Sequence, residues 1–169
     1  MTTGSPMESA KRPRSILAGP YAHPFHPILV TVPIGAWVAS LVFDLASAAV
    51  SDKEAMFAEG AYWLIALGVV GALAAAIFGL LDLLTIPRGT RAFKVGLTHM
   101  SLNLFVVVLF VVGFLVRAAQ GYEEFSGVGT LISIVALALL GLSGWLGGEL
   151  AYRYGVRVAS EETQQEGFR

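Results

Sequence analysis

Seven ionisable side chains lie within or beside long apolar stretches of this sequence, where a charge is costly. They are His23, His26, Asp44, Asp82, His99, Arg117 and Glu149. In a chain that crosses a bilayer, such residues are rare and are functional candidates by default. Imidazole nitrogens and carboxylate oxygens ligate transition metals, and two imidazoles from different helices can hold a haem iron. Their chemistry therefore depends on which helices carry them, and at which end.

The apolar stretches are long enough to form four membrane spans. Of the 169 residues, 56% are hydrophobic and 14% are charged, whereas a soluble domain has about 25% charged residues. A span needs about 20 apolar residues. The pattern predicts an all-α, polytopic up-down bundle over residues 20–158, with four transmembrane helices at about 27–50, 61–86, 92–118 and 128–154. Pro33 is expected to kink the first helix.

The segments outside these helices are polar. Residues 1–19 are predicted to be a disordered tail, 51–60 a polar loop, and 159–169 a polar tail. No internal repeat is evident in the sequence. The chain has no Cys, which excludes thiolate ligands, and its net charge of −1 argues against a nucleic-acid partner.

The positions of Lys and Arg predict the orientation of the bundle. Nine of the eleven flank the spans on one side, namely Lys11, Arg12, Arg14, Arg88, Arg91, Lys94, Arg153, Arg157 and Arg169. Lys53 and Arg117 lie on the other side. Because basic flanks stay in the cytoplasm, we expect a multi-pass protein of the bacterial cytoplasmic membrane with both termini cytoplasmic.

All three His and two of the acids are predicted to meet at the cytoplasmic end. His26 begins the first span, with His23 just before it. Asp82 and Glu149 lie near the ends of the second and fourth spans, and His99 lies about two turns into the third. Because adjacent spans run in opposite directions, these five positions share one end of the bundle.

A second pairing is predicted at the opposite end. His26 and Asp44 are 18 residues apart, as are His99 and Arg117. This spacing is about five helical turns, so each pair lies on one helix face. The first and third spans run in the same direction, which puts Asp44 and Arg117 at one level. We expect these two residues to form an ion pair.

Three interpretations of the inner cluster stay open. A b-type haem would take His26 and His99 as axial ligands, with His23 and Asn103 as alternates. A non-haem transition metal would take its ligands from His23, His26, Asp82, His99 and Glu149. A proton or ion path would use Asp82, His99 and Glu149 as relay groups.

A purely structural interpretation stands beside these. His26 would cap the first span, His99 would hydrogen-bond Asp82, and Glu149 would pair with Arg88 or Arg91. Small residues at intervals of four, Gly68, Ala72 and Ala76 in one span and Gly144 and Gly148 in another, are expected to pack helices within one bundle.

Four segments resemble a bacterial membrane-protein family called domain of unknown function 2231. They read HPFHPILVTVPIGAWVASLVFD, GLLDLLTIPRGT, THMSLNL and GWLGGELAYRYGVRV, in that order. The resemblance spans about residues 20–158. Its pattern matches at His23, Pro24, His26, Pro27, Pro33, Gly35, Asp44, Gly79, Asp82, His99, Asn103, Gly147, Gly148, Glu149 and Gly155.

The resemblance implies the fold but no established activity. Some members of that family carry a Rieske-type iron–sulfur domain, which favours membrane electron transfer beside a redox partner. The leading hypothesis is therefore a haem- or metal-binding membrane protein. A cofactor-free assembly subunit and a proton-coupled transporter or channel are the alternatives, and homo-oligomerisation stays open. The sequence shows no nucleophile–base pair, so we do not expect an independent enzyme.

Overall fold

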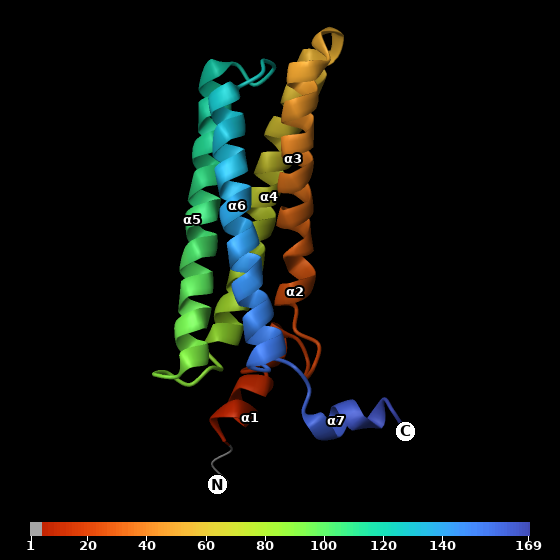
Figure 1. The fold of residues 1–169 in the computed structure, drawn as a ribbon, viewed down its shortest axis with the longest axis vertical. Helices are drawn as coiled ribbons and strands as arrows, with labels where there is room; N and C mark the ends of the chain where they lie inside the picture. The colour runs from red at the N-terminus through yellow and green to blue at the C-terminus, as the bar shows by residue number, and fades with distance from the viewer. Residues whose placement is uncertain (1–4) are drawn as a thin grey trace.

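Four long helical columns run side by side in an up-down arrangement (Figure 1). The computed structural model describes residues 5–169, and within that range it has no strand. The columns are α2 (His26–Leu29) with α3 (Thr31–Ala49), α4 (Glu54–Leu83), α5 (Arg91–Gln120) and α6 (Gly127–Gly148). Each is long and apolar enough to cross a membrane. The predicted all-α, four-helix membrane bundle is confirmed.

Both described chain ends lie at the same end of the bundle as the loop between α4 and α5 (Figure 1). We call this the inner end. The loops between α3 and α4 and between α5 and α6 lie at the opposite end, which we call the outer end.

The first column is interrupted at Val30, between α2 and α3. Pro33 has no N–H, so the carbonyl of Leu29 loses its helical donor and the ring crowds that turn. The helical hydrogen bonds resume where the Ile34 N–H donates to the Val30 carbonyl, at 3.2 Å. The expected kink is thus a break three residues before the proline.

The start of the second span differs from the sequence-based expectation. α4 begins at Glu54, after the short 3-10 turn η2 (Ser51–Lys53), so most of the predicted loop 51–60 is helical. Glu, Ala and Met in this stretch favour a helix. α6 continues into the π-helical turn η3 (Glu149–Arg153), where the Tyr154 N–H donates to the Glu149 carbonyl at 3.1 Å.

The tails are more ordered than the sequence suggests. Residues 5–19 include α1 (Pro6–Lys11) and the 3-10 turn η1 (Ile16–Ala18), and α7 (Glu161–Glu166) follows the bundle. A reciprocal capping box between Ser5 and Glu8 starts α1. Ala10 and Ala18 are buried, which anchors this segment. Residues 1–4 lie outside the described range.

Large aromatic and aliphatic side chains fill the middle of the bundle. Trp37 and Phe110 stack with their ring centroids 4.1 Å apart, and Ile65, Val106 and Ala136 pack around them. Many other large apolar side chains point outward, such as Val70, Ile77 and Leu131. Outward apolar faces suit a lipid solvent, in which buried and exposed faces are equally apolar.

Candidate functional site at the inner end

His26 and His99 face each other across the inner end of the bundle. Their ring centroids are 6.3 Å apart, with the planes nearly perpendicular at 89°. His26 opens α2, and His99 lies in the third turn of α5. Both side chains are partly buried. Two imidazoles from separate helices therefore share one site.

A backbone carbonyl of a neighbouring helix orients each ring. His26 Nδ1 lies 2.9 Å from the Ala75 carbonyl oxygen of α4, and His99 Nδ1 lies 2.8 Å from the Ser143 carbonyl oxygen of α6. A carbonyl only accepts hydrogen bonds, so each Nδ1 carries a hydrogen, and in the neutral ring Nε2 then has the lone pair. This tautomer is the one found in metal-ligating histidines.

Asn103 and Ser143 hold His99 in place. Asn103 Nδ2 donates to the His99 carbonyl at 2.9 Å and to Ser143 Oγ at 2.7 Å. It also lies 3.4 Å from Nδ1 and 3.2 Å from Nε2 of His99. These similar distances place the amide against both ring nitrogens, so Asn103 helps to fix the ring of His99.

Glycines make room for both rings. A Cβ at Gly79 of α4 would lie 2.9 Å from His26 Cε1, and a Cβ at Gly147 of α6 would lie 3.2 Å from His99 Cε1. Each glycine is one turn beyond the carbonyl that its histidine bonds. The ring positions therefore depend on glycines, which have no side chain, in the neighbouring helices.

The two histidine environments are equivalent in the two halves of the bundle. His26 faces His99, Trp37 stacks on Phe110, and Asp44 pairs with Arg117, each partner 73 residues further along the chain. The two residues whose carbonyls accept from the histidines, Ala75 and Ser143, are 68 residues apart, as are Gly79 and Gly147. The hairpins α2–α4 and α5–α6 thus form two related halves, with the histidines at their seam.

The structural interpretation expected a hydrogen bond between Asp82 and His99, but Asp82 has a different partner. It forms a buried ion pair with Arg157, whose Nε lies 2.7 Å from Asp82 Oδ1. Sequence reasoning counted Arg157 only as a basic flank. Its left-handed backbone, at φ 60°, turns the chain back under the bundle.

Arg157 also joins both terminal segments to the bundle. Its backbone N–H donates to the Ala10 carbonyl at 2.9 Å, and Nη2 donates to the carbonyls of Ala18 and Gly19 at 3.0 and 3.2 Å. Nearby, the Ser160 N–H donates to the Tyr21 hydroxyl, and hydrogen bonding to Ser160 lowers the pKa of Tyr21. The inner end is therefore closed by residues far apart in sequence.

Two other candidates lie outside the imidazole pair. Glu149 accepts from Arg153 Nη1 at 2.9 Å and from the Tyr154 hydroxyl at 3.1 Å, and not from Arg88 or Arg91. The ring of His23 bonds its neighbouring backbone at Tyr21. Within residues 5–169, no three His, Asp or Glu side chains are arranged to hold a metal ion.

The outer end brings Asp44 and Arg117 together in an ion pair. Both side chains are only 3% exposed. Arg117 also donates to the Gly113 carbonyl at 3.0 Å and to Ser133 Oγ at 3.2 Å. This pair joins the first and third columns at the level that the spacing predicted.

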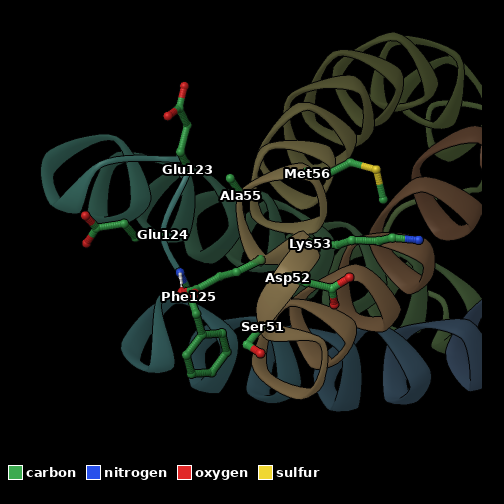
Figure 2. Close-up of a pocket in the computed structure, with 9 residues that line it drawn as sticks. Ser51, Asp52, Lys53, Ala55, Met56, Glu123, Glu124 and Phe125 are labelled. Atoms are coloured by element: carbon green, nitrogen blue, oxygen red, sulfur yellow. Dashed lines mark hydrogen bonds between the residues drawn. The ribbon is translucent and has the colours of Figure 1, made fainter.

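An open hollow of about 720 Å³ also lies at the outer end, between residues 51–56 and 123–125. Figure 2 shows the carboxylates of Asp52, Glu123 and Glu124 pointing in different directions. Because these groups do not converge, the hollow presents a solvated acidic surface rather than a ligand set.

A family model described as "Predicted membrane protein (DUF2231)" matches residues 22–160. The chain belongs to this family. The match includes both histidines, their carbonyl and glycine partners, and both buried ion pairs. No curated protein and no solved structure matches the chain.

Replacing Gly79 by Ala is expected to displace His26 in this DUF2231 protein. The new methyl would press on the ring and weaken its bond to the Ala75 carbonyl, at a cost of about 1–3 kcal/mol. Gly147→Ala should cost less because the gap to His99 is wider. Thermal unfolding in detergent measures both, and an equal effect of the two substitutions would contradict the geometry.

Proposed function

We propose that this DUF2231 protein coordinates the iron of a b-type haem through His26 and His99, for electron transfer in the bacterial cytoplasmic membrane. The observation that carries the proposal is the pair of imidazoles, each fixed by an Nδ1 hydrogen bond, that face each other across the bundle.

The separation of the rings suits a shared metal. A metal about 2.0 Å from one nitrogen of each ring would place two coaxial ring centroids about 6 Å apart. The observed 6.3 Å is close to this value. The chain has no Cys, so a haem would be held without thioether bonds.

The number of donors favours haem over a bare ion. A protein site for a free transition metal normally supplies three or four ligands, and the described residues bring no such set together. A haem iron needs only two axial ligands from the chain. It would supply one-electron chemistry, and the protein would supply the axial ligands and their orientation.

A flat macrocycle held by both histidines would lie in the seam between the hairpins. α3 packs most extensively with α4, and α5 with α6. His26 and His99 belong to different hairpins, so they approach this seam from opposite sides.

The apolar layer above the site favours electron transfer over ion transport. Trp37, Ile65, Val106, Phe110 and Ala136 are almost completely buried in the middle of the bundle. A dry layer opposes the passage of ions. The uneven distribution of Lys and Arg supports a cytoplasmic inner end, where a separate redox partner would dock.

A structural or assembly role is the second candidate. The hydrogen bond from Asn103 to Ser143 and the two buried ion pairs would hold the helices together without any cofactor. Under this alternative, His99→Ala would lower the melting temperature and change no spectrum.

The test is a reduced-minus-oxidised absorption spectrum of the purified protein, made with haem available, with elemental analysis of the same sample. We expect Soret and α-band differences in the wild type and their loss in His99→Ala. His23→Ala is the matched control, since His23 lies outside the pair, and it should keep the bands.

Three results would contradict the proposal. Unchanged haem occupancy in His99→Ala would remove His99 as a ligand. A stoichiometric metal without haem bands would show that the site binds a bare metal ion instead of haem. The absence of both signals would leave the assembly role as the supported function.

A further inference from the structure

The N-terminal segment at the inner end combines cations with exposed apolar side chains. Arg12 and Arg14 are exposed, and Ile16 and Leu17, which follow them, are 82% and 69% exposed. A basic segment with an apolar tip is typical of chains that lie in the headgroup layer of a membrane. This segment lies at the inner end of the bundle, directly before the first span.

Backbone contacts hold the apolar tip in a fixed position. Gly19 donates to the Ile16 carbonyl at 3.1 Å, and Phe25 donates to the Ala18 carbonyl at 3.3 Å. Ala18 itself is buried and accepts from Arg157. The tip is therefore presented by a fixed turn rather than by a free tail.

A small apolar groove adjoins this turn. It has a volume of about 190 Å³ and is lined by Phe25, Ile28, Leu29 and Phe78. Ile28 is 64% exposed, so the groove opens on the outer surface of the first candidate membrane span. The bond from Phe25 to Ala18 connects the groove directly to the turn.

The charge of this region complements an anionic headgroup. The Arg12 guanidinium lies 5.8 Å from the centroid of the Tyr21 ring, which orients it. The exposed cations Arg88, Arg91 and Lys94 lie at the same end, in and just after the loop between α4 and α5, and are not part of this surface. Clusters of cations at a span end attract anionic lipids.

We propose that this surface binds one anionic phospholipid. Arg12 and Arg14 would hold its phosphate, the groove would receive part of an acyl chain, and Ile16 and Leu17 would insert beside it. Guanidinium groups bind phosphate oxygens with good geometry, and apolar burial holds the chain. This site is separate from the imidazole pair and does not depend on the haem proposal.

The test counts retained lipids by native mass spectrometry. The full chain is purified from nanodiscs of phosphatidylcholine mixed with phosphatidylglycerol. We expect the wild type to retain one phosphatidylglycerol in preference to phosphatidylcholine. Arg12→Gln/Arg14→Gln should weaken that preference roughly 10- to 30-fold, because each Arg contributes about 1 kcal/mol near an anionic surface.

The matched control is Arg88→Gln/Arg91→Gln, which removes the same charge from the same end but away from the groove. It should keep the bound lipid, while Ile16→Ser/Leu17→Ser should weaken retention of both lipids. Melting temperatures in pure phosphatidylcholine check that each variant is folded. No preference in the wild type, or equal loss in both Arg variants, would overturn the proposal.

Discussion

Arg117→Met is expected to destabilise the bundle by about 3–5 kcal/mol, because it leaves Asp44 buried without its partner. Both side chains are almost completely inaccessible, so water cannot replace the guanidinium. The substitution also removes the donors to Gly113 and Ser133. Unfolding of the detergent-purified protein, by heat or denaturant, measures the loss.

A double substitution separates the charge from the packing. In Asp44→Leu/Arg117→Met the buried charges are gone and the volume is largely kept, so stability should return near to the wild-type value. The coupling energy from the full double-mutant cycle should be large because the two residues touch. Additive single effects would show that the pair does not join the first and third columns.

Gly68→Ala is expected to cost up to about 3 kcal/mol, through overpacking. A Cβ at this position would overlap the indole of Trp37, which is buried and stacked on Phe110. The indole cannot move without disturbing that stack and its hydrogen bond to the Ile65 carbonyl. Thermal unfolding and the near-ultraviolet circular dichroism of the protein, to which Trp37 contributes, would report the change.

Gly144→Ala is the matched control. It is the same substitution within a spanning helix, but no atom lies within 4 Å of its new Cβ. Ala has the higher helix propensity, so this variant should be neutral or more stable by up to about 1 kcal/mol. A loss as large as that of Gly68→Ala would mean that Gly144 packs against something in the folded protein, such as a second copy.

The equivalence of the two hairpins bears on how such a site is built. Identical spacings bring His26 to His99, Trp37 to Phe110 and Asp44 to Arg117. The paired residues mostly differ in type, so the repeat is not visible in the sequence. It becomes visible only when the contacts are compared, because the two hairpins share helical register rather than residue identity.

The length of the apolar stretches and the spacing of the polar residues were enough to predict the number of spans and the level of each polar residue along the bundle. Helical rise converts residue number into height, which is why the 18-residue spacings predicted the level of Asp44 and Arg117. Alternating span direction likewise placed His26, Asp82 and His99 at one end. These statements need only length, spacing and direction.

The rotation of each helix and the residues that touch follow from the packing of the whole bundle. In a lipid solvent both faces of a span are apolar, so periodicity does not mark the inward face. Gly68 therefore faces Trp37 while Gly144 faces outward. Asp82 pairs with Arg157 because a left-handed turn after α6 returns the chain under the bundle, a long-range contact that no local pattern encodes.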